Sequence, residues 1–444
     1  MIIRLLPNLL KDKLPEQVAL LKDLNARGDL FVTKDLIDAD LQMLSDLGAV
    51  HADFLINGFQ NIDNALYKGV FQMDQFQLGE LIQQEDLGKV TSDLKIDGRG
   101  FTQKTLNTKI EGTIASIEYH NYRYTNIDLN GGFKMPVFEG VFKVNDPNLK
   151  MSFDGLVSID GKENQYVFKS DIAHADLYEL KWSKKDTISL LKGSLDINLN
   201  GSTVEDVYGK ISIKKASYVN PSETYEFNDF EIESRFDQQK IRTITVNSPD
   251  IIQGELKGYF YFKELKKVIE NSLGGIYANY NPHKISNNQH LTFNFNIYNK
   301  IIDIFLPEVS FGKNTIINGK ISTADNDFKL NFISPELIAY KNHAFNVNLG
   351  IDNKNEAYNT LLSADSIRSK RYKVSQFSLK NSYDNDTLRV NTEFKGGKQM
   401  EDTYHLNLFH TINAKKQSVV GFKKSTVDFK SYQWVINESS ELEN

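Results

Sequence analysis

Apolar and polar residues alternate with a period of two along most of this chain. In residues 149–159 every odd position is apolar or glycine, and all but one of the even positions are polar. This alternation is typical of a β-strand that has one dry face and one wet face. Turn-forming pairs such as Asp146-Pro147 and Asn200-Gly201 separate comparable segments as far as residue 436. The pattern predicts a mostly β protein built from antiparallel strands.

Four stretches show the spacing of a helix instead. In residues 14–28 the apolar side chains form one stripe, and Gly28 is suited to a left-handed C-terminal cap. Residues 263–274 carry a second stripe, and short helices are expected at 78–84 and 300–307. The helix at 263–274 would either plug a groove in the sheet or cover a strand edge.

The chain is too long for one compact core. It has 444 residues, whereas single cores stop growing at roughly 250–300 residues. About two dozen candidate strands, each ~4.8 Å wide, would form a sheet on the order of 100 Å long. A flat sheet of that size would leave its apolar face wet. We therefore expect an elongated, folded-over (U-shaped, taco-like) antiparallel β-sheet with an apolar lengthwise groove and a few short helices. The alternative is a closed sandwich or barrel, in which the same face is an ordinary core.

No long Pro-, Gly- or Ser-rich linker divides the strands. The sequence therefore predicts five consecutive parts, which are a helical lead-in, a first part of the groove, a helical and loop interruption, a second part of the groove and a frayed tail. Their expected bounds are 1–28, 29–262, 263–308, 309–436 and 437–444.

Composition excludes several classes of function. The net charge of −6 argues against nucleic acid as a partner, because phosphate binding needs clustered Lys and Arg. The absence of cysteine excludes disulfides, thiol catalysis and Cys-ligated zinc. No apolar run reaches the roughly 18–20 residues that span a bilayer. The opening MIIRLLPNLLKDK lacks a small-residue cleavage site, so it is not expected to be a signal peptide, and an exported chain would carry its signal elsewhere.

No motif for bond-making chemistry occurs, so we expect neither an enzyme nor a cofactor nor a metal site. His405 and His410 are the closest histidine pair, but an odd spacing puts them on opposite faces of a strand. Asp325-Asn326-Asp327 and Asp384-Asn385-Asp386 lack the twelve-residue calcium pattern, so hairpin turns are the favoured interpretation. The pairs 214–215, 266–267 and 423–424 are lysines that we expect to be solvated or to protect strand edges.

Residues 60–133 resemble the middle region of TamB-type translocation and assembly module proteins of the AsmA-like superfamily. The strings that carry the resemblance are NALYKG (64–69), DLGKVTSDLKIDGRGF (86–101), LNTKIEGTI (106–114) and NDPNLKMSFDGLV (145–157). The resemblance is specific over about 29–260 and looser over 260–444. It implies a periplasmic β body in the envelope of a two-membraned bacterium. It also implies an inner-membrane anchor at an N-terminus and a C-terminal domain that meets an Omp85-family outer-membrane barrel, neither of which is visible in this chain.

The resemblance implies that the groove binds and conducts the acyl chains of phospholipid between the two membranes. The residues expected to line it are Met151, Phe153, Val157, Ile159, Ile197, Leu199, Leu256, Phe260, Phe293, Phe295, Val347 and Leu349. One alternative is a scaffold or chaperone that engages outer-membrane proteins through strand edges. A second alternative is a surface adhesin or glycan-binding protein, for which Tyr277, Tyr280 and Trp434 are the aromatic residues to examine.

Overall fold

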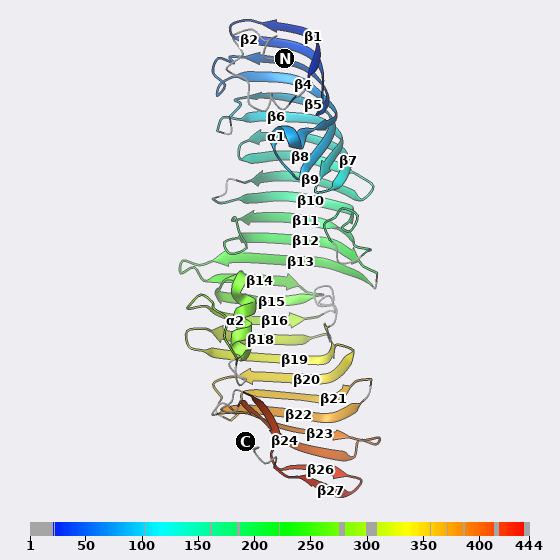
Figure 1. Ribbon diagram of the computed structural model, residues 1–444, viewed down its shortest axis with the longest axis vertical. Coiled ribbons are helices and arrows are strands. Elements are labelled where there is room, and N and C mark those ends of the chain that lie inside the picture. The colour runs from blue at the N-terminus through cyan, green and yellow to red at the C-terminus, as the bar shows by residue number, and fades with distance from the viewer. Residues whose placement is uncertain are drawn as a thin grey trace. The chain divides into compact units, whose positions relative to one another are not determined.

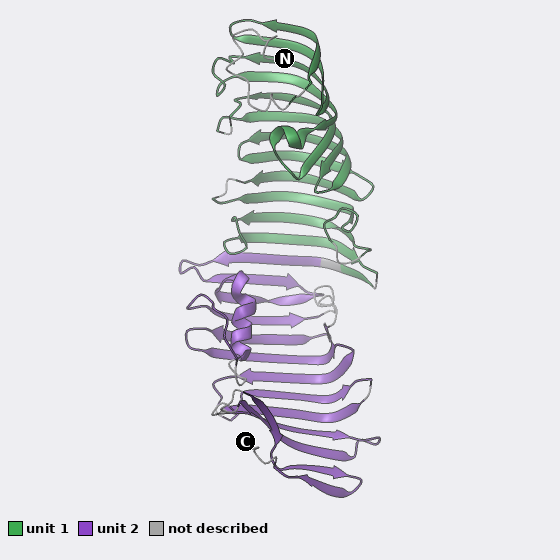
Figure 2. Cartoon of the chain, in the orientation of Figure 1, with its two compact units in different colours: residues 1–228 green, residues 229–444 purple. Residues whose placement is uncertain are grey.

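The structure is a computed structural model, and it divides into two compact units. Unit 1 comprises residues 1–228 and unit 2 comprises residues 229–444 (Figure 2). The structure describes residue 21 and residues 23–438, without 103, 160–161, 184–186, 222, 275–279, 299–308, 356, 371, 385–386 and 413–416, and for 227, 228 and 384 it describes the backbone alone. The boundary between the units lies inside a strand at 228/229, and the five expected parts of the chain stay a prediction.

Unit 1 is an antiparallel sheet with one short helix (Figure 1). Each strand from β1 to β12 pairs with the next one in the sequence. The helix α1 (Leu78–Ile82) lies between β4 and β5. The strands are β1 (Asn25–Val32), β2 (Leu36–Ser45), β3 (Gly48–Asn57), β4 (Leu66–Gln77), β5 (Leu87–Arg99), β6 (Asn107–Tyr119), β7 (Tyr122–Lys134), β8 (Val137–Asn145), β9 (Leu149–Ser158), β10 (Gln165–Asp176), β11 (Leu190–Asn200) and β12 (Tyr208–Val219), and the unit ends within β13 (Thr224–Phe236).

Unit 2 is also an antiparallel sheet, with one longer helix, α2 (Phe262–Gly274). Most strands pair in sequence order, but β16 pairs with β18, and β24 pairs with both β25 and β26. After β13 the strands are β14 (Arg242–Ser248), β15 (Ile252–Tyr259), β16 (His290–Ile297), β17 (Val309–Phe311), β18 (Thr315–Ser322), β19 (Asp327–Ala339), β20 (Asn342–Asp352), β21 (Thr360–Arg368), β22 (Lys373–Asp384), β23 (Thr387–Gly396), β24 (Asp402–Ile412), β25 (Ser418–Phe422), β26 (Ser425–Phe429) and β27 (Tyr432–Ile436).

The period-two pattern correctly predicted a mostly β chain of antiparallel strands. The described chain is mostly antiparallel strand, and the helices expected at 78–84 and 263–274 are observed as α1 and α2. The helix expected at 300–307 and the end of the tail, 439–444, lie outside the described residues.

The predicted helix at 14–28 is wrong over its last four residues, which belong to strand β1. Gly28 is not a helix cap, since it lies opposite Leu41 of β2 in the sheet. Its φ of +139° is a backbone conformation that glycine adopts readily and other residues rarely adopt. An added Cβ would lie 1.9 Å from the Asp40 carbonyl oxygen. Pairing with β2 therefore outweighs the local helical stripe. Residues 14–20 lie outside the described part of the chain.

Candidate functional site

One face of the unit 1 sheet is apolar from strand to strand. The register places apolar side chains opposite one another across neighbouring strands, so that they form a row perpendicular to the strands. One such row runs from β2 to β9 through Leu41, Ala52, Phe71, Leu94, Gly112, Leu129, Phe142 and Phe153. This row and the apolar positions beside it form the apolar face of unit 1.

The opposite face of the same strands is polar. Shifting the row by one residue gives Gln42, His51, Gln72, Asp93, Thr113, Asp128, Lys143, Ser152 and Asp171. The alternation predicted from the sequence thus holds across nine strands at once. A sheet with two such different faces must be wet on one side and protected from water on the other.

Aromatic rings pack along part of the apolar face. The ring centroids of Phe142 and Phe153 are 4.6 Å apart in a stacked arrangement, and those of Phe153 and Phe168 are 4.9 Å apart. These three phenylalanines come from β8, β9 and β10, so the contact continues across strands. Such ring pairs add stability beyond the area that they bury.

No second sheet packs over the apolar face of unit 1 in the part of the chain that the structure describes. Most of its side chains are half-buried, and Phe153, at 7% exposed, is among the more protected. The register shifts by β-bulges between Met73 and Phe76 and between Ile172 and His174. Bulges bend strands and increase their twist, and long strands of unit 1 bend in Figure 1. The folded-over shape itself remains a prediction.

At the β2–β5 end of this face there is an apolar pocket of about 250 Å³. Leu78 and Leu81 of α1 cover one side of it, and Leu21 and Leu24 contribute from the segment before β1. The sheet side is lined by Met43, Val50, Phe71, Met73, Leu94 and Ile96. Sequence analysis did not single out these residues, although their alternation was visible. Only the strand register brings them together.

A buried cluster lies on the apolar face around β7 to β11, and Phe142 and Met151 pack against it. Leu180, fully buried, and Ala175 pack with Ile172, Leu149 and Tyr124. Sequence analysis did not identify this cluster either, because Leu180 lies in a turn and not in an alternating segment.

Five of the six groove residues predicted in unit 1 lie together on the apolar face. Met151, Phe153 and Val157 belong to β9, and the register connects them through β10 to Ile197 and Leu199 of β11. Tyr166 of β10, for example, is opposite both Val157 and Leu199. The sixth, Ile159, differs from the expectation. It lies one residue beyond the end of β9 and is 61% exposed, so it does not continue the face.

In unit 2 the helix α2 covers part of the apolar face of that unit's sheet. Val268 of α2 is 1% exposed and belongs to a core cluster that also contains Phe260, Leu291, Ile321, Phe328 and Ile351. Leu256 and Phe293 pack against the same cluster. Figure 1 shows α2 crossing several strands of this sheet. Three predicted groove residues, Leu256, Phe260 and Phe293, therefore lie in a packed core, and α2 covers the face of the sheet and not a strand edge.

Of the other three predicted groove residues of unit 2, Val347 and Leu349 lie on β20, and Phe295 lies on β16 two residues after Phe293. Val347 is 4% exposed and forms a cluster with Phe332 and Ala364, against which Leu349 packs. Phe295 lies opposite Ile317 of β18. These contacts are those of a sheet core, and they do not by themselves show an open groove.

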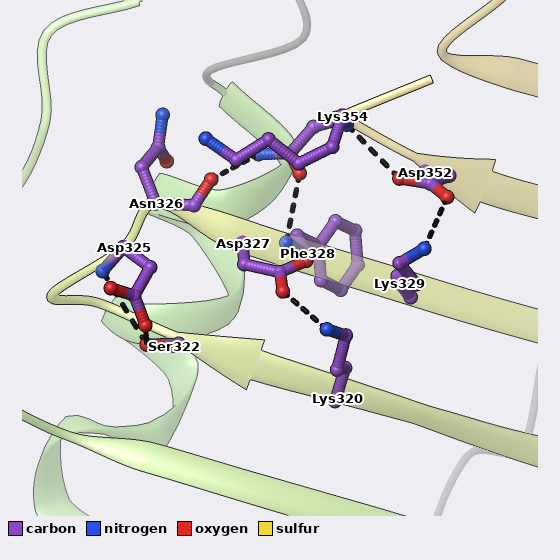
Figure 3. Close-up of polar contacts among 10 residues, drawn as sticks. Lys320, Ser322, Asp325, Asn326, Asp327, Phe328, Lys329, Asp352 and Lys354 are labelled. Carbon is purple, nitrogen blue, oxygen red and sulfur yellow. Dashed lines mark hydrogen bonds and ion pairs between the residues drawn. The ribbon is translucent and has the colours of Figure 1, made fainter.

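The segment Asp325-Asn326-Asp327 forms a hairpin end, as predicted, between β18 and β19 (Figure 3). The Ser322 hydroxyl donates a hydrogen bond to Asp325 Oδ2 at 2.8 Å, and the Lys320 ammonium pairs with Asp327. Both carboxylates thus already have protein partners. The corresponding turn at 385–386 lies outside the described residues.

Polar contacts beside this hairpin hold the next strand. Lys329 Nζ is 2.6 Å from Asp352 Oδ2, and the backbone N–H of Lys354 donates to Asp352 Oδ1 at 3.0 Å (Figure 3). Burial alone would raise the pKa of Asp352, but these two hydrogen bonds hold it below its ordinary value. The arrangement is a structural ion pair at the end of β19 and β20.

The histidine pair forms no shared site. His405 Nδ1 lies 3.5 Å from Glu393 Oε1, whereas His410 Nε2 lies 2.8 Å from the Ser418 hydroxyl. Among the residues described, no group of three His, Asp or Glu side chains could hold a metal ion. The six paired lysines are all exposed, as expected.

The aromatic residues that an adhesin would present are only partly exposed. Trp434 is 64% exposed on β27, whereas the Tyr280 hydroxyl donates to Asn271 Oδ1 of α2 at 3.0 Å. Tyr277 lies outside the described residues. Tyr432, two residues before Trp434 on the same strand, is also exposed, and the adhesin alternative stays a prediction.

Neither of the two described helices has the length and apolar character needed to cross a bilayer. In comparisons with known proteins, no protein-family model, no curated protein and no solved structure matches this chain.

Proposed function

We propose that unit 1 binds the acyl chains of phospholipid along its apolar face and guides them without catalysis. The observation that carries this proposal is the row of apolar side chains from β2 to β9, over which the described residues place no second sheet. The resemblance of residues 60–133 to TamB-type proteins supports the same function. In this proposal the chain is a periplasmic segment of an envelope protein.

The physical argument is additive. Each CH₂ group removed from water contributes about 0.8 kcal/mol, so an acyl chain gains affinity with every strand that it crosses. The row contains no charged side chain that would fix the ligand at one position. Binding is then strong in total but weak at any one strand, and the ligand can move along the face.

The resemblance adds two partners. One is the inner membrane, reached through an N-terminal anchor, and the other is an Omp85-family barrel, reached through a C-terminal domain. A conduit needs both contacts, because it must receive lipid from one membrane and deliver it to the other.

Photo-crosslinking of the full chain in a bacterial cell tests the proposal. A photoreactive amino acid is placed at Met151 or Phe153 on the apolar face, and at Ser152 or Asp154 on the polar face as matched controls. We expect phospholipid adducts, detected by mass spectrometry, at 151 and 153 and not at 152 and 154. Adducts at neither pair, or equally at both pairs, would contradict acyl-chain binding on this face.

A second candidate function is a scaffold that engages unfolded β-barrel proteins by strand addition. The observation that favours it is β27, which pairs only with β26 among the residues described. Its side chains Tyr432, Trp434 and Val435 are 75%, 64% and 49% exposed. An exposed apolar edge strand is a template for pairing with another chain.

The two functions predict different sensitive residues. Trp434→Pro removes a backbone donor from the edge strand, whereas Phe153→Asp introduces a charge on the apolar face. If strand addition is the function, only Trp434→Pro abolishes protection of an unfolded outer-membrane barrel protein from aggregation. If lipid binding is the function, only Phe153→Asp abolishes the phospholipid adducts at Met151.

A further inference from the structure

The polar face of unit 2 contains a hollow that is lined by cationic side chains. Its volume is about 510 Å³, and strands β22, β23 and β24 form its floor. Three cationic side chains line it, namely Lys380, Arg389 and Lys423. We call this hollow the basic pocket.

The strand register brings the three cations together from distant positions in the sequence. Arg389 of β23 lies opposite Ser382, which is two residues from Lys380 on β22. Lys380 and Arg389 are therefore diagonal neighbours, with Cα atoms about 7–8 Å apart. On its other side Arg389 lies opposite Phe409 of β24. The Lys423 ammonium lies 5.4 Å from the centre of the Phe409 ring. Arg389 and Lys423 therefore flank the same buried ring.

No acidic side chain is among the described residues that line the basic pocket. A hollow on the polar face of unit 1 differs in its charge, because Asp154, Asp171 and Asp196 line it together with two lysines. Two acids lie near these strands: Glu438 lies 3.7 Å from the Lys423 ammonium and partly offsets its charge, whereas Glu393 lies 3.5 Å from His405. Clustered cations without lining acids favour an anionic ligand.

The remaining polar side chains of the basic pocket suit a ligand with hydroxyl groups. Asn391 Nδ2 donates to Asn407 Oδ1 at 2.5 Å, and Asn407 Nδ2 donates to the Lys424 carbonyl oxygen at 2.7 Å. These bonds hold two amides side by side on the floor. Ser382 adds a hydroxyl group beside Arg389. Amides and hydroxyls both donate and accept hydrogen bonds, so they can act as donor or as acceptor toward a sugar hydroxyl.

We propose that the basic pocket binds a phosphorylated, hydroxyl-rich ligand of the size of a sugar phosphate. A phosphomonoester carries a charge of about −1.5 to −2 at neutral pH, which Lys380 and Arg389 can neutralise, and Lys423, which also pairs with Glu438, adds a third cation at the rim. The guanidinium of Arg389 can bind two phosphate oxygens at once. The volume is within the range of roughly 300–1,000 Å³ that small-molecule sites occupy. This proposal does not depend on acyl-chain binding by unit 1, because it concerns other residues on the opposite kind of surface.

Calorimetric titration of the full chain tests the proposal at low ionic strength, where exposed charges are least screened. The probes are glucose 1-phosphate, glucose and inorganic phosphate. Arg389→Gln removes a cation of the basic pocket. Arg235→Gln is the matched control, because Arg235 is an exposed arginine of β13 that pairs with Glu233 at 3.9 Å, away from the basic pocket. Lys380→Gln is a second pocket variant, and circular dichroism checks that all variants fold.

We expect glucose 1-phosphate to bind more tightly than inorganic phosphate and glucose not to bind. Arg389→Gln and Lys380→Gln should each weaken the affinity by about fivefold, as expected for one exposed charge, while Arg235→Gln should leave it unchanged. The proposal is overturned if glucose 1-phosphate does not bind, or if all three variants weaken its binding equally.

The phosphate group could come from a soluble sugar phosphate or from a lipid headgroup. Flotation with phosphatidylcholine vesicles that contain phosphatidic acid separates these sources. Flotation that Arg389→Gln abolishes would overturn the soluble-ligand proposal in favour of a headgroup. Binding of glucose 1-phosphate without vesicle flotation supports it.

Discussion

At the scale of single residues, Asp146 is the clearest example of a buried charge with a structural function. It is 1% exposed, and its carboxylate accepts four hydrogen bonds from Tyr122, Thr125 and the backbone N–H of Asn148. Burial, followed by the hydrogen bond to Asp146, raises the pKa of the Tyr122 hydroxyl to about 12. The carboxylate thus fixes the turn between β8 and β9 and holds the neighbouring strand β7.

We predict that Asp146→Ala destabilises the chain by about 3 kcal/mol, because several buried donors lose a charged acceptor at once. Urea unfolding followed by circular dichroism measures this loss. Asp154→Ala is the matched control, since Asp154 is exposed on the polar face of β9, and it should change the free energy of unfolding by less than about 0.5 kcal/mol. Equal effects of the two substitutions would show that the hydrogen bonds of Asp146 do not stabilise the fold.

The imidazole ring of His51 has a hydrogen-bond partner at each of its two nitrogens. His51 Nε2 lies 2.7 Å from Asp40 Oδ1, and Nδ1 lies 3.1 Å from Gln72 Oε1. The Gln72 amide nitrogen is already used, since it donates to Asp93 at 2.9 Å. Both of these contacts are hydrogen bonds at once only when both ring nitrogens donate, as they do in the imidazolium. The hydrogen bond with Asp40, followed by that with Gln72, raises the pKa of His51 above 6.5.

The sign of the pH dependence follows from this raised pKa. The folded state binds the proton more tightly than the unfolded state, so the stabilisation is complete below pH 6.5 and disappears as the pH rises through the folded-state pKa. We predict that wild type exceeds His51→Gln in melting temperature at roughly pH 5.5, and that the difference shrinks at roughly pH 9. An NMR titration of the His51 ring should give a pKa above 6.5. A melting difference that does not change with pH would contradict the assignment of an imidazolium.

At the scale of elements, α2 decides which part of the unit 2 face is accessible. The Glu264 carboxylate in its first turn accepts hydrogen bonds from the Ser286 backbone N–H at 2.8 Å and from Gln289 Nε2 at 2.7 Å. The backbone hydrogen bond from Ser286 is the main reason that the pKa of Glu264 is lowered. Apolar contacts of Val268 fix the middle of the helix. The helix is therefore attached at its first turn and at its centre.

We predict that Val268→Asp detaches α2 from the sheet, because it places an unpaired carboxylate in an apolar core. A photoreactive amino acid at Phe293 should then give phospholipid adducts that the unsubstituted chain does not give. Ile269→Asp is the matched control, because the neighbouring Ile269 is 43% exposed and should leave α2 in place. Adducts at Phe293 without any substitution in α2 would show that the helix does not cover this face.

The same elements show how much the sequence could predict. A period of two identifies the face of each residue, so the placement of Phe153 and Leu199 on one face was predictable. It does not give the register between strands, which β-bulges shift in several places. The apolar pocket beneath α1 and the basic pocket around Arg389 both depend on register. Neither could be recognised before the strands were aligned. The helix predicted from the apolar stripe before Gly28 was wrong over residues 25–28 for a related reason. Those residues pair with β2, and a local pattern does not show which strand a segment will pair with.

At the scale of the whole chain, the two proposed sites depend on different physical forces. The apolar face of unit 1 binds by removing apolar surface from water, and salt does not weaken this effect. The basic pocket of unit 2 binds through exposed charges, whose range falls from about 10 Å at 0.1 M salt to about 3 Å at 1 M. A chain with a net charge of −6 has no general attraction for anions, so any anion binding must come from local clusters of cations.

This difference gives a prediction that separates the two proposals in one sample. When salt is raised from about 0.1 M to about 1 M, phospholipid adducts at Phe153 should stay constant or increase, while the affinity for glucose 1-phosphate should fall. Mass spectrometry of the adducts and calorimetric titration measure the two quantities on the same full chain. Loss of the Phe153 adducts at high salt would mean that charge, and not the apolar face, holds the lipid. Salt-independent binding of glucose 1-phosphate would mean that Lys380, Arg389 and Lys423 do not provide the binding energy.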